Sequence, residues 1–125
     1  MKITCGTDII EIDRVKESIE ELGEKFIKRV FTDKEIEYCE SRKGQKYQHY
    51  AGRFAAKEAA FKAISKILDN KYSVCWKDFE IIDDEQGRPY LNLYNVNTKD
   101  IESIDISISH CKLYATANVV ILFND

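Results

Sequence analysis

The chain has 125 residues, enough for one domain spanning 1–125 and too few for two. Hydrophobic residues make up 44% and charged residues 33%, as in ordinary globular proteins, and the net charge of -3 argues against a general nucleic-acid binder. No apolar run approaches the roughly 20 residues of a membrane span, and the first residues turn polar too soon for a signal peptide. We therefore expect a cytoplasmic protein without a membrane partner.

The cysteines are spread along the chain without any C-x-x-C pair, at Cys5, Cys39, Cys75 and Cys111. Zinc sites and disulfide frameworks favour clustered cysteines or a secreted protein, so we expect reduced and mostly buried thiols. The two glycine-rich phosphate-binding patterns, G-x-x-x-x-G-K-S/T and G-x-G-x-x-G, are both absent.

A strand is predicted over residues 3–12, where apolar and polar residues alternate through Ile10 and Ile12. Gly6 interrupts this strand and predicts either a bulge or a close approach of another backbone. Asp8 follows among apolar neighbours, where a carboxylate costs free energy unless it is paired or binds a metal. An edge or bulge aspartate that bonds to the backbone is the alternative to a ligand at this position.

Two short helices are predicted next. Asp13 can cap the first, which ends at Gly23, and the second covers about 24–31. The second helix carries a basic stripe at positions i, i+3 and i+4, formed by Lys25, Lys28 and Arg29. Most such stripes are solvated faces, but on an acidic protein a basic patch also attracts an acidic partner.

The strongest helix signal lies in the middle of the chain. A capping box at Thr32 and Glu35 starts a helix that closes near Gly44, and a longer helix follows from about Tyr47 to 69–70. Both sides of the longer helix are expected to be buried, because large apolar residues line one side and alanines line the other. The two sets are Phe54, Phe61, Ile64 and Leu68, and Ala55, Ala56, Ala59, Ala60 and Ala63.

Charged residues lie at the two seams between these sides. Glu58 and Lys62 project from one seam, one turn apart, and Arg53 and Lys57 form a similar pair on the other. As a surface ion pair, Glu58 and Lys62 would contribute only about 0.2–0.5 kcal/mol. In a semi-buried cleft the same two groups would suit metal, phosphate or proton chemistry. The helix alone leaves both interpretations open.

The last 50 residues are dominated by strand patterns. A turn at Gly87 joins two of the strands, and Pro89 suits the first position of the second one. Strands are predicted over about 79–81, 90–94, 104–109 and 113–123. Helices in the first part and strands in the last predict an α+β fold, with helices packed on a largely antiparallel sheet.

Three features need a common explanation: Asp8 in an apolar strand, Glu58 with Lys62 on the central helix, and the segment 107–110 (SISH) that ends a strand. Two carboxylates, completed by water and by substrate phosphate oxygens, suit Mg²⁺, which rarely occupies an all-protein cage. A shared divalent ion also offsets the desolvation that each carboxylate would suffer alone. Lys62 would then face the same phosphates.

Five blocks of the chain, in the same order, resemble the holo-(acyl-carrier-protein) synthases. Residues 6–15 (GTDIIEIDRV) are similar to the amino-terminal signature of that family, and 31–38 (FTDKEIEY) to its next block. Residues 53–63 (RFAAKEAAFKA) resemble its central signature, and the last two blocks match at 87–89 and within 107–117. Each block alone is weak or moderate support, whereas five in order over nearly the whole chain are strong support.

This resemblance implies a 4'-phosphopantetheinyl transferase, which moves the phosphopantetheine arm of coenzyme A onto a serine of apo acyl carrier protein and releases 3',5'-ADP. It also implies a homotrimer with active sites between subunits. In the family's pattern Asp8 and Glu58 hold Mg²⁺, Glu58 accepts the serine proton directly or through a metal-bound water, and Lys62 neutralises the transferred phosphate or the leaving ADP. The pattern places nucleotide contacts on Arg53, Gly87, Pro89, Ser109 and His110, and carrier docking on Arg14, Lys25, Lys28 and Arg29.

The chain departs from the family's pattern in two places. After Ala63 the family keeps a glycine-containing turn for the coenzyme A phosphates, whereas the helical pattern here continues through 64–68 and offers the charge of Lys66 instead. The stretch after Tyr94 is also short, where the family usually has a helix.

Two other functions would use part of the same features. A Mg²⁺-dependent enzyme that hydrolyses a nucleotide pyrophosphate would need Asp8, Glu58 and Lys62 but not the basic helix. A non-catalytic module that recognises acidic helical partners would need the basic helix alone. Incubation with coenzyme A, Mg²⁺ and an apo carrier protein distinguishes all three.

Overall fold

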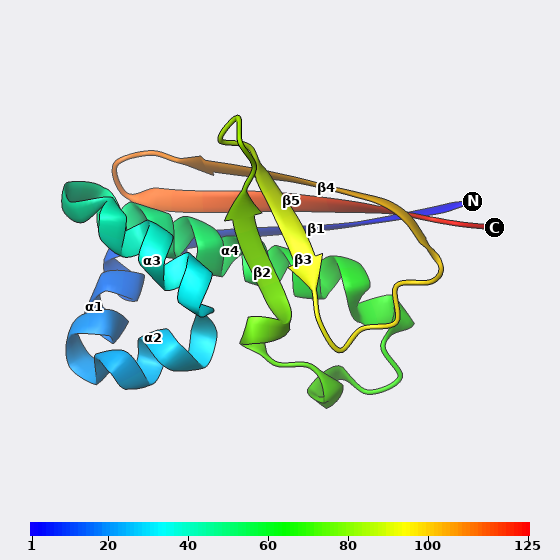
Figure 1. The fold of residues 1–125 in the computed structure, drawn as a ribbon, viewed down its shortest axis with the longest axis horizontal. Helices are drawn as coiled ribbons and strands as arrows, with labels where there is room; N and C mark the ends of the chain where they lie inside the picture. The colour runs from blue at the N-terminus through cyan, green and yellow to red at the C-terminus, as the bar shows by residue number, and fades with distance from the viewer.

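The computed structural model describes residues 1–125, and its largest element is a three-stranded antiparallel sheet. The strand order is β1 (Lys2–Glu11), β5 (Tyr114–Phe123) and β4 (Ile101–His110), so the first strand of the chain pairs with the last. The long helix α4 (Lys46–Ile64) packs on one face of this sheet, and the two chain ends lie side by side at one end of it (Figure 1).

The remaining elements pack around α4, and β3 also contacts β4 of the larger sheet. A second, two-stranded antiparallel sheet is formed by β2 (Phe79–Asp83) and β3 (Pro89–Leu93). Three helices precede α4: α1 (Ile12–Leu22), α2 (Glu24–Val30) and α3 (Asp33–Ser41). Four 3-10 turns complete the chain: η1 (Lys43–Gln45), η2 (Ser65–Ile67), η3 (Lys71–Ser73) and η4 (Trp76–Asp78). The predicted α+β arrangement is therefore confirmed.

The close packing of α4 on β1 depends on small residues on both elements. A Cβ atom at Gly6 would lie 1.9 Å from the carbonyl oxygen of Ala59, so only glycine fits at this crossing. Two residues earlier, Thr4 Oγ1 donates a hydrogen bond to the carbonyl oxygen of Ala63 over 2.7 Å. Of the two alternatives for Gly6, the close backbone approach is the one observed, because the β1–β5 register passes through Gly6 without a bulge.

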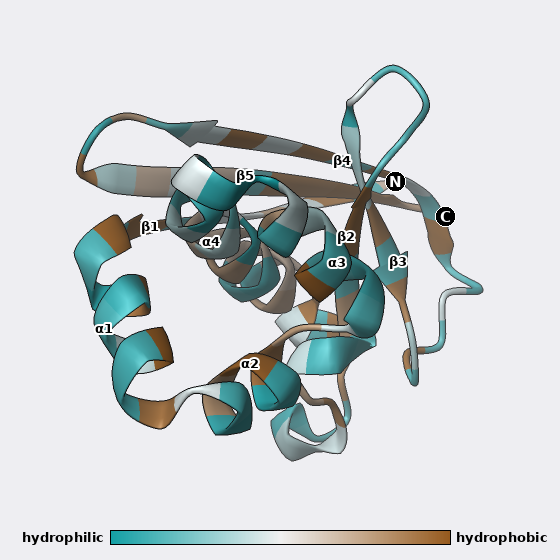
Figure 2. Cartoon of the chain, turned by 60° about the vertical axis from the view of Figure 1, so that its left-hand side comes forward, coloured by the Kyte–Doolittle hydropathy of each residue, from teal (hydrophilic) through white to brown (hydrophobic).

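Two groups of buried side chains make up the core. The larger lies between α4 and the inner faces of the sheets, and it includes the alanine stripe with Val119 and Ile121. The smaller joins α1, α2, α3 and the start of α4 around Phe31 and Tyr50. The predicted alternation along β4 is visible as successive brown and teal bands (Figure 2). None of the helices combines the length and the apolar character that a bilayer crossing needs.

Two predicted helix boundaries are wrong. α4 ends at Ile64 and tightens into η2, several residues before the predicted end at 69–70, and Ile67 and Leu68 pack on the larger core. α1 begins at Ile12 rather than after a capping Asp13. The Ile12 N–H donates to the carbonyl oxygen of Leu113 at 2.9 Å, so tertiary contact replaces the side-chain cap. The capping box at the start of α3 is confirmed.

The cysteines differ from expectation in burial. All of them are free thiols, as predicted, but only Cys39 is buried, while Cys5, Cys75 and Cys111 are exposed. Cys5 belongs to the outward-facing row of β1, which a monomer leaves uncovered. The composition-based expectation of mostly buried cysteines is therefore wrong.

Candidate active site

Asp8 and Lys62 meet where β1 passes under the last turn of α4. Asp8 lies opposite the buried Ala117 of β5, so it belongs to the row of β1 that faces the helix. Lys62 Nζ donates to the carbonyl oxygen of Thr7 at 2.9 Å and to Asp8 Oδ1 at 3.4 Å. The Asp8 side chain is 19% exposed and that of Lys62 is 52% exposed, so a flexible ammonium reaches a recessed carboxylate from the solvent side.

Glu58 lies one turn before Lys62 on α4 and is close enough to Asp8 for their charges to interact. Burial raises the pKa of the Glu58 carboxyl, the negative charge of Asp8 raises it further, and the positive charge of Lys62 lowers it. The first two effects prevail, so the ionised form of Glu58 is disfavoured relative to an exposed glutamate. A cation shared by the two carboxylates would relieve this repulsion.

The donor set at this point fits Mg²⁺. Asp8 and Glu58 supply carboxylate oxygens, and the chain contains no group of three or more His, Cys, Asp or Glu side chains that could hold a metal ion. Such a set is too small for a closed structural zinc site. It suits Mg²⁺, which keeps several water or phosphate oxygens in its coordination sphere.

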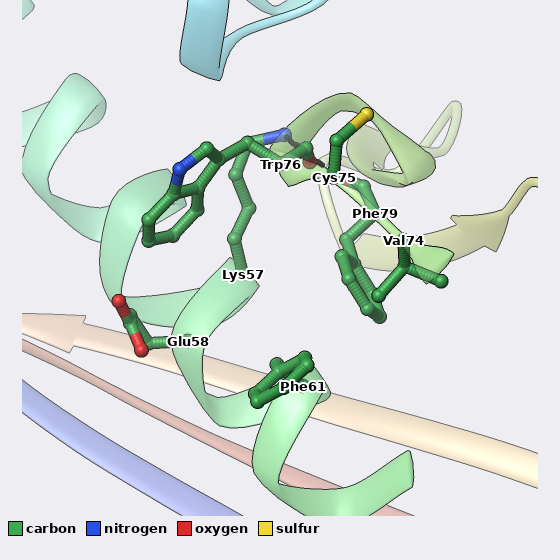
Figure 3. A pocket seen from close by; sticks show the side chains of 7 residues that line it. All are labelled: Lys57, Glu58, Phe61, Val74, Cys75, Trp76 and Phe79. Atoms are coloured by element: carbon green, nitrogen blue, oxygen red, sulfur yellow. Dashed lines mark hydrogen bonds between the residues drawn. The ribbon is translucent and has the colours of Figure 1, made fainter. Parts of the chain in front are cut away.

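A largely apolar pocket of about 220 Å³ adjoins Glu58. Glu58 and Phe61 of α4 line one side of it. Trp76 of η4 and Phe79, the first residue of β2, line the other (Figure 3). The Cys75 sulfur points away from Glu58 in the same view. The complete lining is Lys57, Glu58, Phe61, Val74, Cys75, Trp76 and Phe79.

Arg53 belongs to a second cluster, roughly 13 Å along α4 from Lys62 at the rise of an α-helix. Its side chain is 5% exposed, and its guanidinium lies 4.0 Å from the ring centroid of Tyr38 and 3.5 Å from Asp83 Oδ1. Arg53 Nε has no hydrogen-bond partner within the chain. An unpaired donor at this depth is unusual and marks Arg53 as a group with spare binding capacity.

Two histidines extend this second cluster toward the end of β4. The His49 ring lies 5.3 Å from that of Tyr38, and the His110 ring lies 6.2 Å from that of His49. Burial lowers the pKa of His49, and the positive charges of Arg53 and Arg42 lower it further. The guanidinium groups of Arg42 and Arg53 lie 4.8 Å and 4.0 Å from the ring centroid of Tyr38, so two cations converge on this aromatic side chain.

The other predicted nucleotide contacts divide between the hairpin and the sheet. Gly87 has a φ of 80° in the turn between β2 and β3, which is the left-handed conformation that glycine adopts readily. Pro89 is the first residue of β3 and pairs with Asp83, the partner of Arg53. Ser109 is exposed on the face of the sheet opposite to Asp8, since it pairs with Thr116 in the outward row. Within one chain Arg53 therefore lies next to the β2–β3 hairpin, whereas Ser109 lies on the outer face of the larger sheet.

The predicted docking residues lie in two places. Lys25 and Arg29 flank an apolar pocket of about 340 Å³ whose other walls are Leu22, Phe26, Val30, Phe54 and Trp76. Lys28 is outside this pocket and lies 3.8 Å from Glu24 in an exposed ion pair. Arg14 is 3.6 Å from Glu11 and borders a different pocket, next to Ile9.

Sequence reasoning missed two residues of the site region. Lys57, predicted on a helix seam, is completely buried and forms a 2.7 Å ion pair with Glu35. Trp76 lines both the pocket beside Glu58 and the pocket between Lys25 and Arg29. The only available signal was that Trp76 is the single tryptophan of the chain, and nothing in its local pattern distinguishes a wall from a core residue.

Comparison with known proteins identifies relatives along the whole chain. The sequence model of the 4'-phosphopantetheinyl transferase superfamily matches residues 4–120. The holo-(acyl-carrier-protein) synthase of Ruminiclostridium cellulolyticum is 46% identical over 130 residues, covering 100% of this chain and 96% of the relative. That of Protochlamydia amoebophila is 43% identical over 122 residues, covering 96% and 98%.

Solved structures agree with these sequence matches. The complex of ACPS with CoA from Chronobacterium ammoniagenes has a TM-score of 0.82 and 28% identity, covering 100% of both chains. The holo-(acyl-carrier-protein) synthase of Helicobacter pylori in complex with coenzyme A has a TM-score of 0.81 and 30% identity, covering 94% of this chain and 99% of the other. With the family match over residues 4–120, the chain belongs to the 4'-phosphopantetheinyl transferase superfamily.

Proposed function

We propose that this chain transfers the 4'-phosphopantetheine group of coenzyme A to a serine of apo acyl carrier protein and releases adenosine 3',5'-bisphosphate. Relatives at 43–46% identity are named as synthases of the holo carrier protein, and two structural neighbours are complexes with coenzyme A. The observation that carries the proposal is the meeting of Asp8, Glu58 and Lys62, from two elements far apart in sequence.

In this reaction Asp8 and Glu58 would hold Mg²⁺ through their carboxylate oxygens, and the ion would supply charge neutralisation for the pyrophosphate of coenzyme A. Glu58 accepts the proton of the serine hydroxyl while the serine oxygen bonds to the phosphorus that carries pantetheine. The bond from that phosphorus to adenosine 3',5'-bisphosphate breaks, and the Lys62 ammonium neutralises the phosphate oxygens.

The nucleotide part of coenzyme A is assigned to the second cluster. Arg53 contributes positive charge, the His110 imidazole offers a hydrogen-bonding nitrogen, Gly87 and Pro89 border the adenine, and Ser109 offers a hydroxyl from the outer face of the sheet. Because Ser109 faces the side of the sheet opposite to Asp8 in one chain, whereas His110 lies on the same side as Asp8, Ser109 would reach a substrate bound at Asp8 best from a neighbouring subunit. This supports sites between subunits, as in the homotrimer that the family resemblance implies.

The acidic carrier protein is assigned to the basic residues of α1 and α2. Lys25 and Arg29 flank an apolar pocket, which suits a helix that carries both acidic and apolar side chains. Arg14 and Lys28 add positive charge at the edges, where they attract the carrier before contact. Trp76, which lines this pocket and the one beside Glu58, connects docking to the reaction site.

The proposal is tested by incubating the purified protein with coenzyme A, Mg²⁺ and an apo acyl carrier protein. Intact-protein mass spectrometry should show a carrier mass increase of one phosphopantetheine, and the increase should disappear when the carrier serine is replaced by alanine. Chelation of Mg²⁺ should abolish the reaction.

Two outcomes would contradict the proposed reaction. Release of adenosine 3',5'-bisphosphate in the absence of carrier, with no carrier modification in its presence, would indicate a pyrophosphate hydrolase. Carrier binding without any change in carrier mass, after prolonged incubation, would indicate a binding module. The cytoplasmic location remains a prediction from the sequence.

A further inference from the structure

The Lys57 ammonium is completely buried one residue before Glu58, although the proposed reaction does not use it. Its Nζ lies 2.7 Å from Glu35 Oε1 and donates to the carbonyl oxygens of Trp76, at 3.2 Å, and of Phe79. An ammonium has three donor hydrogens, so these contacts use the full capacity of the group. Three acceptors from three different elements therefore converge on one side chain of α4.

Both carboxylate oxygens of Glu35 also accept hydrogen bonds. Its Oε1 also accepts from the Thr32 N–H at 2.9 Å, as part of the capping box of α3, and its Oε2 accepts from the Ile81 N–H of β2 at 2.8 Å. The Glu35–Lys57 pair therefore joins α3, α4, η4 and β2. A buried ion pair is commonly no more stable than a well-packed apolar pair in its place, so stability alone does not explain it.

The two carbonyls held by Lys57 belong to residues whose side chains form the pocket beside Glu58. Trp76 is the first residue of η4 and Phe79 follows it as the first residue of β2, and both face Glu58 and Phe61 across the pocket (Figure 3). The Trp76 ring also stacks on Phe54, with centroids 5.0 Å apart, at the border of the basic docking pocket. The position of η4 relative to α4 thus sets the shape of both pockets.

We propose that Lys57 is a positioning residue for the transferase site: by holding the Trp76 and Phe79 carbonyls, it fixes the pocket wall that faces Glu58. The catalytic consequence rests on the proposed function, whereas the structural consequence does not. Glu35 compensates the charge, and the contact that positions the wall is the donation from Lys57 to the two carbonyls.

Two variants that share one substitution separate positioning from stability. In Glu35→Gln the Lys57 side chain still donates to both carbonyls, so the wall stays in place although the protein loses stability. In Glu35→Gln with Lys57→Met, a side chain of similar length fills the same space without any donor, and no buried charge remains. Thermal unfolding is measured for both, to show that the comparison is made at similar stability.

Two readouts are measured on folded protein. Trp76 is the only tryptophan, so its fluorescence emission and its quenching by acrylamide report the wall directly. We expect the emission and the kcat/KM for carrier modification of Glu35→Gln to stay near those of the unchanged protein. In the double variant we expect red-shifted emission, stronger quenching and a loss of about tenfold or more in kcat/KM, as misplacement of site groups produces.

Identical emission and identical kcat/KM in the two variants would overturn the proposal and leave Lys57 a purely structural residue. Trp76→Ala supplies a second test if the double variant does not fold, because the indole is only partly buried. This variant should lose kcat/KM to a similar extent, and retention of full activity would also overturn the proposal. If the unchanged protein modifies no carrier, the proposed function fails, while the emission comparison still decides the position of the wall.

Discussion

The Glu58 carboxylate opposes folding at neutral pH in the absence of a cation. Its pKa is raised in the folded protein, so the folded state binds its proton more tightly than the unfolded state does. Stability linked to this group is therefore present at low pH and decreases as pH rises through the raised value. Glu58→Gln should raise the melting temperature of the metal-free protein at pH 7, and the gain should vanish below the ordinary carboxyl pKa.

The same variant should lose activity while it gains stability. Removal of the proposed proton acceptor and of one proposed Mg²⁺ ligand should reduce kcat by roughly 10²-fold or more. Differential scanning fluorimetry from pH 4 to pH 8 measures the first effect, and carrier modification measures the second. Glu102→Gln, on the exposed surface of β4, is the control and should change neither. An unchanged or lower melting temperature of Glu58→Gln at pH 7 would show that Lys62 already balances the charge.

The thiols should differ widely in reactivity. Burial raises the pKa of Cys39 to about 12, whereas hydrogen bonds from the backbone around Leu113 and Tyr114 lower the pKa of the exposed Cys111. The thiolate is the reactive form, so iodoacetamide at pH 8 should alkylate Cys111 first and leave Cys39 unmodified until the protein unfolds. Peptide mass spectrometry of a time course measures the order, and early alkylation of Cys39 would contradict its burial.

Among the helices, α2 presents its basic residues to two different environments. Arg29 lies at an apolar pocket where a partner would be desolvated, whereas Lys28 is exposed and paired with Glu24. Charge reversal at a desolvated contact is expected to weaken binding more than reversal at an exposed edge. Arg29→Glu should therefore raise the Kd for apo carrier protein about tenfold or more, and Lys28→Glu should raise it less.

The two variants carry the same charge change on the same helix, so Lys28→Glu serves as the matched control for net charge. Isothermal calorimetry with apo carrier protein measures the affinity, and coenzyme A binding should be unchanged in both. Equal weakening by the two substitutions would show that α2 acts through its overall charge alone. No weakening by either would remove α2 from the docking surface.

The sequence predicted those features of α4 and β1 that depend on local sterics. Alanines on one side of a helix and a glycine in a strand allow the two backbones to approach closely. Gly6 does cross Ala59 without room for a Cβ atom. The end of α4 was not predictable in the same way. Its sequence remains compatible with helix beyond Ile64, but the structure ends the helix there and Ile67 and Leu68 pack on the core.

Burial of charge was the feature that sequence described least well. Glu35 was identified as part of a capping box, yet its second oxygen and its ion pair involve residues 22 to 46 positions away. Periodicity places Lys57 correctly at a helix seam but contains no information on which element will cover that seam. Asp8 stood out in the sequence because a carboxylate in an apolar strand is a local anomaly that requires a partner. The search for that partner led to Glu58 and Lys62.

At the scale of the whole molecule, the outer face of the larger sheet is the most unusual surface. Ile3 and Ile9 of β1 are each 67% exposed, and Val120 of β5, opposite Cys5, is 43% exposed. Apolar residues gathered on an exposed sheet face indicate an interaction surface. The proposed sites between subunits need such a surface, because Ser109 lies on this face and Asp8 on the other.

Introducing a charge on this face should therefore disrupt both assembly and activity. Ile9→Asp adds a carboxylate at a position that is already exposed in one chain, so the fold of the subunit should be preserved. Sedimentation velocity should show a trimer for the unchanged protein and a monomer for Ile9→Asp, with transferase activity lost by about 10²-fold because the two halves of each site separate. Tyr72→Asp, at a residue 81% exposed in η3, is the control and should remain trimeric. A monomeric unchanged protein with full activity would contradict the shared site, and a trimeric Ile9→Asp would place the contact on another surface.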